Sequence, residues 1–120
     1  MKAPATLTIE YMPCDHLSQL YHGLHELAAK NIISLRLQPV DSPNGLKPVI
    51  RAWLQSAGHR DIRLVYDTLD GLNWVDDLTE SENLRYFQDN FEADFYFKRS
   101  FSHRLIEFSP KNCTVLPLGL

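Results

Sequence analysis

The last six residues of the sequence, Val115-Leu116-Pro117-Leu118-Gly119-Leu120, carry the clearest indication of the fold. The apolar start of this run predicts a buried strand, and the proline and glycine that follow predict a turn leaving it. In an α/β fold, such a turn leads into a helix or a second domain. We therefore expect the 120 residues to form one domain, the N-terminal half of a two-domain architecture.

Upstream of this run, short apolar segments alternate with segments of helical periodicity. Five strands are expected from alternation and β-rich composition, at 7–11, 32–38, 62–66, 93–97 and 113–116. Helices are expected between them, at 16–30, 49–57, from Thr79 onward and at 102–108. Helices between consecutive strands imply parallel strands with right-handed crossovers. The sequence thus predicts an α/β domain, a three-layer α/β/α Rossmann-like fold with a five-stranded, mostly parallel sheet.

Local signals refine these expectations. Asp15 or Ser18 is expected to cap the first helix. The segment 49–57 is assigned to a helix with Gly58 just past its end, because its apolar residues recur at helical spacing. Those residues are Val49, Ile50, Trp53 and Leu54. The segment 39–48, rich in proline, asparagine and glycine, is expected to be a loop.

Composition excludes several classes of protein. Hydrophobic residues make up 44% and charged residues 22%, as in ordinary soluble globular domains. The net charge of −3 argues against nucleic acid as a partner, since nucleic-acid surfaces carry a basic stripe. No apolar run reaches the length of a membrane span, and no signal peptide is evident, so a cytoplasmic location is expected. Cys14 and Cys113 fall at opposite edges of the predicted sheet and are expected to be free thiols.

Candidate ligand-binding residues follow from the placement of the strands. Open parallel sheets bind ligands beyond the carboxyl ends of their strands, at the point where the strand order reverses. The candidate residues that follow the predicted strands are Asp15, His16, Asp67, Asp70, Gly71, Lys98, Arg99 and Ser100. Lys98 and Arg99 suit a phosphate or carboxylate, or alternatively form internal ion pairs with Asp67 or Asp70. Asp15 also suits a helix cap, and the segment 67–71 also suits a simple turn.

Other chemistry has little support in the sequence. His22 and His25 have helical i, i+3 spacing, but no acid or cysteine accompanies them, so no metal site is expected. No glycine-rich nucleotide loop and no nucleophile elbow is present, and no cofactor or catalytic residue is predicted. Seven aromatic residues gather within 86–101 and are assigned mainly to the core. Some of them also suit stacking on a sugar ring or packing against a partner domain.

Three segments together resemble a known group of proteins. The run Val65-Tyr66-Asp67-Thr68-Leu69-Asp70-Gly71, the strand end with Phe97-Lys98-Arg99-Ser100, and the exit with Pro117-Leu118-Gly119 occur in this order. This arrangement resembles the N-terminal half of bacterial two-domain (GT-B-type) glycosyltransferase-like proteins. The resemblance covers roughly the second half of the chain. It implies an acceptor-side Rossmann-like domain and a nucleotide-sugar or sugar-acceptor ligand. The cleft would be completed by a C-terminal domain or a second copy, and no activity is expected from this chain alone.

Two other classes of function stay open. A response-regulator receiver has about this length, and Asp15, Asp67 and Ser100 loosely match its acidic and hydroxyl positions. The paired acids after the first strand and the lysine after the last are missing, which favours a degenerate receiver acting by protein–protein contact. A pure interaction module is the third hypothesis. It predicts dimerisation or aggregation if a sheet face lies uncovered.

Overall fold

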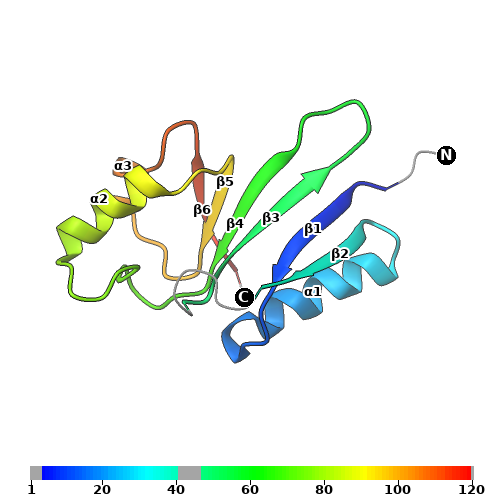
Figure 1. The fold of residues 1–120 in the computed structure, drawn as a ribbon, viewed down its shortest axis with the longest axis horizontal. Helices are drawn as coiled ribbons and strands as arrows, with labels where there is room; N and C mark the ends of the chain where they lie inside the picture. Colours follow the sequence, from blue (N-terminus) through cyan, green and yellow to red (C-terminus); the bar gives the residue numbers. More distant parts are fainter. Residues whose placement is uncertain (1–3, 41–46, 120) are drawn as a thin grey trace.

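A computed structural model of the chain describes residues 4–40 and 47–119. They form an α/β domain whose six-stranded mixed sheet has the order β2-β1-β3-β4-β5-β6 (Figure 1). The strands are β1 (Thr6–Tyr11), β2 (Ser34–Pro39), β3 (Val49–Gln55), β4 (Ile62–Asp67), β5 (Phe95–Lys98) and β6 (Thr114–Pro117). The helical elements are η1 (Asp15–Leu17), α1 (Ser18–Ala29), α2 (Glu80–Asn90) and α3 (Arg104–Glu107).

The sheet is mixed because β3 runs against both of its neighbours. β1 pairs with β2 in parallel, and β4, β5 and β6 pair with one another in parallel. β3 is antiparallel to β1 on one side and to β4 on the other. The other five strands therefore point the same way, and the expected count of five strands was one too low.

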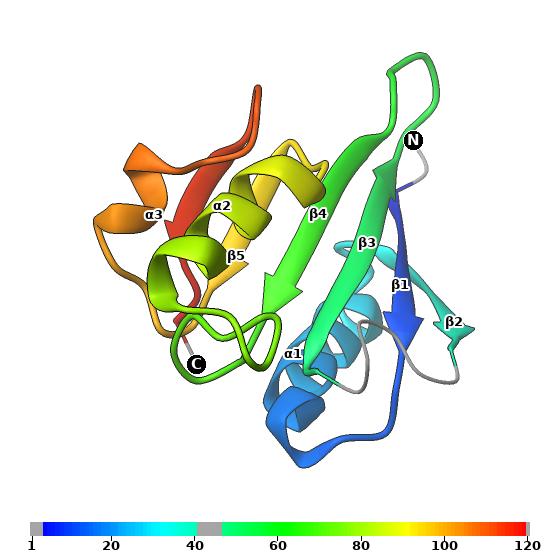
Figure 2. The ribbon, with the colours of Figure 1, turned by 60° about the vertical axis from the view of Figure 1, so that its left-hand side comes forward.

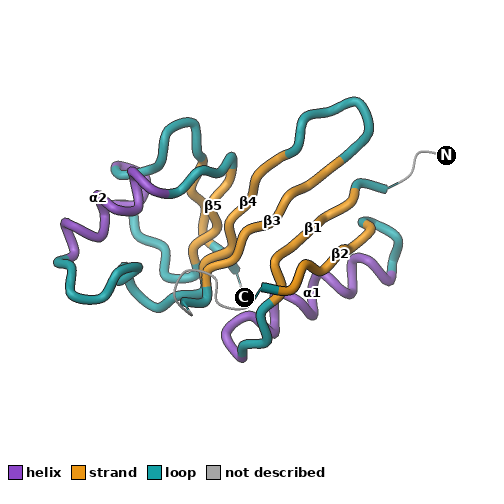
Figure 3. Tube along the Cα trace, in the orientation of Figure 1, coloured by secondary structure: helices purple, strands orange, loops and turns teal. Residues whose placement is uncertain are grey.

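The extra strand is the segment 49–57, whose assignment to a helix was wrong. Figure 3 shows β3 and β4 as long neighbouring strands joined by a single loop. Gly58 lies in that loop with a φ of +80°, so it serves a hairpin turn and not a helix end. Ile50 and Ala52 are buried on one side of β3, and Arg51 between them is exposed. This alternation has the period of a strand, and pairing with two neighbouring strands overrides the weak helical periodicity.

The helices cover opposite faces of the sheet, each over a different half (Figure 2). On one face, Leu20 and Leu24 of α1 pack in one apolar cluster with Ile9 of β1 and Ile50 of β3. On the other face, a second cluster joins α2 and α3 to β4, β5 and β6. Its most buried members are Leu84, Phe87, Tyr96 and Leu105. The order of strands runs outward from β3 in both directions, so the switch in strand order lies at β3.

α2 begins where the helix from Thr79 onward was expected. Thr79 is the N-cap, and its hydroxyl accepts a hydrogen bond from the Glu82 backbone N–H. The Glu82 carboxylate accepts one from the Thr79 backbone N–H, which completes a capping box. Asn83, which is buried, donates to the carbonyls of Val75 and Leu78 and so fixes the preceding loop to the helix.

The remaining expectations on secondary structure are largely confirmed. The five expected strands lie within one or two residues of β1, β2, β4, β5 and β6, and the first and last expected helices contain α1 and α3. The predicted cap of the first helix was wrong: neither Asp15 nor Ser18 caps a backbone N–H, and the Ser18 hydroxyl donates to the Asp15 carbonyl. Residues 41–46 of the expected loop lie outside the described residues. Both cysteines are free.

Candidate functional site

The carboxyl ends of the parallel strands bring the predicted site residues to one edge of the sheet. β4 ends at Asp67 and β5 ends at Lys98, and these two residues are partners in the register. Lys98 is in turn the partner of Pro117, the last residue of β6. β3 starts at the same edge, because Val49 is the register partner of Asp67. The turns after β4, β5 and β6 therefore leave the sheet side by side, as the strand-end rule predicts.

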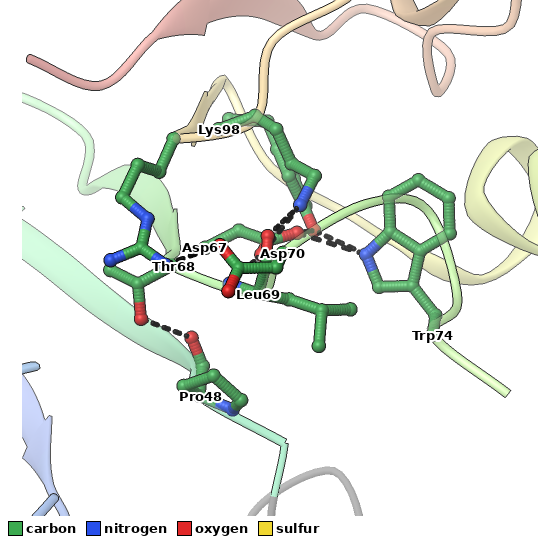
Figure 4. Close-up of polar contacts among 9 residues, drawn as sticks. Pro48, Asp67, Thr68, Leu69, Asp70, Trp74 and Lys98 are labelled. Carbon is green, nitrogen blue, oxygen red and sulfur yellow. Dashed lines mark hydrogen bonds and ion pairs between the residues drawn. The ribbon is translucent and has the colours of Figure 1, made fainter. Parts of the chain in front are cut away.

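Asp67 is the centre of a buried polar network (Figure 4). Its Oδ1 accepts hydrogen bonds from the Leu69 backbone N–H at 2.8 Å and from Lys98 Nζ at 3.2 Å. Its Oδ2 accepts from the Trp74 indole N–H at 2.9 Å and from the Tyr96 hydroxyl. Each carboxylate oxygen thus has two donors, which saturates the carboxylate of a side chain that is 0% exposed.

Lys98 is equally enclosed. Its Nζ donates to the Leu69 carbonyl at 2.6 Å as well as to Asp67, and its side chain is 0% exposed. The ammonium also lies 5.7 Å from the centre of the Trp74 ring. The sequence left two alternatives for Lys98, a contact with an anionic ligand and an internal ion pair. The structure shows the internal ion pair with Asp67. A direct contact of Lys98 with a ligand stays a prediction.

Burial has opposite effects on the pKa values of the two titratable partners of Asp67. Loss of hydration lowers the pKa of Lys98, although the negative charge of Asp67 partly offsets this. Loss of hydration, together with the charge of Asp67, raises the pKa of the Tyr96 hydroxyl well above its usual value. Tyr96 therefore stays a protonated donor to the carboxylate. The network acts as a fixed support for the turn at 67–74.

The turns at this edge also carry residues outside the buried network. We call His16, Asp70 and Arg99 the carboxyl rim. Asp70, whose side chain is 78% exposed, forms an ion pair with Arg99. The hydrogen bond and charge of Arg99, and to a smaller extent the charge of His16, hold the pKa of Asp70 below its usual value. His16, from the turn after β1, thus lies within electrostatic range of Asp70 across the switch in strand order. The turns after β4 and β5 thus bring two predicted residues, Asp70 and Arg99, into direct contact.

The other predicted residues occupy the same turns with less definite roles. Asp15 is exposed at the start of η1. Gly71 is exposed and has a φ of +76°, so a side chain there would be strained. Ser100 is half-buried in the turn after β5. Their contact with a ligand stays a prediction, as it does for the whole set.

Three buried polar residues of the structure were missed from the sequence. Tyr96 was treated only as an aromatic residue, and Trp74 was not considered, although a phenol or an indole N–H usually has a hydrogen-bond partner when buried. In the sequence, Glu10 has the position of a solvent-facing residue in an alternating strand. Its carboxylate is 2% exposed and accepts hydrogen bonds from the backbone and the guanidinium of Arg51. Without the position of β3, nothing in the sequence connects Glu10 with Arg51.

Within residues 4–40 and 47–119, no group of three or more histidine, cysteine or acidic side chains could hold a metal ion. The expectation that no acid accompanies the two histidines was wrong for His22, which lies 3.8 Å from Glu26 on the exposed surface of α1. Over the same residues, no helix has the length and apolar character needed to cross a membrane.

Fold and site together define an α/β domain with a six-stranded mixed sheet and a polar carboxyl edge. Comparison with known protein families, with curated proteins and with solved structures finds no match to the chain.

Proposed function

We propose that this chain is a Rossmann-like, glycosyltransferase-like domain of the acceptor-side type, and that its carboxyl edge binds a nucleotide sugar or a sugar acceptor. The observation that supports this most is the ion pair between Asp70 and Arg99, which joins the turns after β4 and β5 at this edge. A carboxylate accepts hydrogen bonds from sugar hydroxyls. Arg99 donates to Asp70 through one nitrogen, Nη2, and a guanidinium has further N–H donors that can pair with phosphate. In this proposal Asp67 and Lys98 hold the rim from beneath.

Within residues 4–40 and 47–119, the structure shows one wall of the proposed site. The rim residues all project from turns on one sheet edge, and a sugar nucleotide needs contacts on several sides to be enclosed. We propose that the second wall comes from a C-terminal domain or from a second copy of the chain. Accordingly, we expect ligand binding by this chain but no glycosyl transfer by these residues alone.

A thermal-shift experiment tests this proposal. UDP-glucose, UDP, inorganic phosphate, and acetyl phosphate with Mg²⁺ are added separately to the purified chain. A ligand that binds only the folded state raises the unfolding temperature by mass action. The proposal expects a rise with UDP-glucose that is lost in Arg99→Gln. Arg104→Gln is the matched control, because Arg104 is also an arginine paired with an acid: it lies 2.7 Å from Glu80 of α2.

The same experiment distinguishes the receiver hypothesis. A receiver would become phosphorylated by acetyl phosphate at Asp67 and would gain stability only with that reagent and Mg²⁺. The burial of Asp67 and the four donors on its carboxylate count against such chemistry. No rise with any of the four ligands would contradict the proposed function.

A second candidate, an interaction module, has one specific observation in its favour. On the sheet face that carries α1, the half formed by β4, β5 and β6 presents stacked aromatic rings. Tyr66 and Phe97 lie 5.2 Å apart, and Phe95 and Phe97 lie 6.5 Å apart. Leu116 beside them is 37% exposed. None of the described helices packs over Phe95 and Phe97, which belong to neither apolar cluster.

Sedimentation velocity tests this second candidate. If two copies associate through this face, the chain dimerises with rising concentration and Phe97→Thr weakens the dimer. Ile106→Thr is the matched control, since Ile106 is a 54% exposed apolar residue on α3, whose buried residues pack against the other face. A monomer at all concentrations would rule out self-association.

A further inference from the structure

A cleft of about 600 Å³ lies between β3, β4 and α2, on the opposite sheet face from α1. Its floor includes Arg51 and Trp53 of β3 and Arg63 of β4, and its wall includes Tyr86 and Asn90 of α2. A smaller cavity of about 270 Å³ shares Tyr86 with it. The larger volume falls within the range of small-molecule sites, roughly 300–1,000 Å³.

The charges that line the cleft are balanced. Arg51 Nη2 lies 2.8 Å from the buried Glu10 carboxylate, which also accepts from Arg51 Nε at 3.1 Å. Arg63 Nη1 lies 3.9 Å from Glu92, and its Nε lies 3.6 Å from Asp94. Each guanidinium therefore already faces a carboxylate. An anionic ligand would have to compete with these carboxylates, so the lining does not favour phosphate.

The Arg51 side chain is nonetheless available and held in place. It is 61% exposed, while its partner Glu10 is 2% exposed. Because Glu10 also accepts from the Arg51 backbone N–H at 2.7 Å, the carboxylate is fixed on two sides. A guanidinium has five N–H donors, and Glu10 uses only two of those of Arg51. The others can donate to neutral hydroxyl oxygens.

Aromatic side chains complete the lining. The Arg51 guanidinium lies 5.5 Å from the centre of the Trp53 ring, so the two planar groups lie next to each other on the floor. Tyr86 and Phe91 on the wall meet edge to face, with ring centres 6.1 Å apart. Pyranose rings present C–H groups that pack on aromatic faces and hydroxyls that need planar polar partners. Together with the zero net charge, this lining suits a neutral sugar.

We propose that this cleft binds a neutral mono- or disaccharide, with Trp53 and Tyr86 contacting the sugar ring and Arg51 donating to its hydroxyls. The cleft shares no lining residue with the carboxyl rim formed by His16, Asp70 and Arg99. The proposal therefore goes beyond the function proposed for the rim and does not depend on it.

Amide and indole NMR shifts of the ¹⁵N-labelled chain test this proposal. Cellobiose, lactose and chitobiose are titrated separately, up to about 50 mM, a concentration that would saturate a site with a millimolar Kd. Two indole signals are expected, from Trp53 and Trp74. The proposal expects a disaccharide to shift the Trp53 indole and amides around Arg51 and Tyr86, leaving amides around Arg99 in place.

Substitutions of the cleft residues test whether these side chains bind the saccharide. Trp53→Ala should weaken binding about tenfold, and Tyr86→Phe, which removes only a hydroxyl, should weaken it about threefold. Arg36→Gln is the matched control. Arg36 is exposed on β2 and, as the register partner of Thr8, lies on the same sheet face but outside the cleft. Binding should be unchanged in this variant.

Three results would overturn the proposal. The first is the absence of any shift with all three disaccharides. The second is a shift of the cleft signals by inorganic phosphate alone, which would show an anion site. The third is a saccharide Kd that is unchanged in both Trp53→Ala and Tyr86→Phe. None of these measurements uses the Arg99→Gln variant or UDP-glucose. The outcome of the thermal-shift test at the carboxyl rim therefore does not affect them.

Discussion

The Nζ of Lys98 lies 3.2 Å from Oδ1 of Asp67, and both side chains are completely buried. The two residues end adjacent parallel strands, so the pair joins β5 to β4 at the edge where ligands of such sheets bind. The pair is accompanied by donors from Leu69, Trp74 and Tyr96, which leaves the carboxylate fully satisfied. A rigid turn and a saturated carboxylate indicate a supporting role for this pair.

Removing one partner of the pair tests its contribution to stability. In Lys98→Met, the Asp67 carboxylate is left buried without its cation, and we expect a loss of about 3–5 kcal/mol in the free energy of unfolding. Urea unfolding measures this loss. The double variant Lys98→Met/Asp67→Asn removes both charges and should recover part of it.

An exposed ion pair provides the control for that experiment. Lys47 lies 2.8 Å from Asp76, whose side chain is 72% exposed. Lys47→Met should therefore change the free energy of unfolding by less than about 1 kcal/mol. If Lys98→Met were equally mild, the buried pair would not stabilise the edge.

The N-cap of α2 offers a second prediction. The Thr79 hydroxyl accepts from the Glu82 N–H, so Thr79→Ala should lower the free energy of unfolding by about 1 kcal/mol. Thr79→Ser keeps the oxygen and should be close to the native chain. Thermal or urea unfolding of the two variants gives the comparison. Equal stability of the alanine and serine variants would contradict the role of the cap.

The Cys113 thiol gives a prediction for pH. Burial, and to a smaller extent the charge of Asp94, raises the pKa of Cys113 from 9.0 to about 11. Only the thiolate is alkylated, so in Cys14→Ser the rate of alkylation by iodoacetamide should keep rising until about pH 11. A rate that levels off near pH 9 would contradict the burial of this thiol.

The same shift has a consequence for stability. The folded state holds the Cys113 proton to a higher pH than the unfolded state does. Its contribution to stability is therefore fully present below pH 9.0 and is lost as the pH rises through about 11. The raised pKa of the Tyr96 hydroxyl acts in the same direction at still higher pH. Cys113→Ala should make the decline in the free energy of unfolding between pH 9.0 and about pH 11 shallower.

Parts of the fold could be predicted from the sequence because their signals are local. The capping residues Thr79 and Glu82 lie three positions apart, and the strands that end at Asp67 and Lys98 are short, apolar and followed by polar turns. β3 could not be recognised in this way. The spacing of its apolar residues fits both the period of a helix and that of a strand. Its pairing with β1 joins residues far apart in the chain, and its pairing with β4 also lies beyond the reach of local signals.

The site was predictable in position and less so in detail. The rule for strand ends places Asp70 and Arg99 at one edge, and the structure pairs them there. Whether Lys98 faces solvent or Asp67 depends on Trp74, Tyr96 and the Leu69 carbonyl, which enclose it only in the folded chain. The cleft beside α2 depends on the position of β3, so no sequence signal indicated it.

Amide NMR shifts of the chain on titration with UDP-glucose test the proposed carboxyl-edge site most directly. The account predicts that shifts concentrate in the turns that carry His16, Asp70 and Arg99, and that they disappear in Arg99→Gln but persist in Arg104→Gln. Shifts that avoid these turns, or that are unchanged in Arg99→Gln, would contradict it.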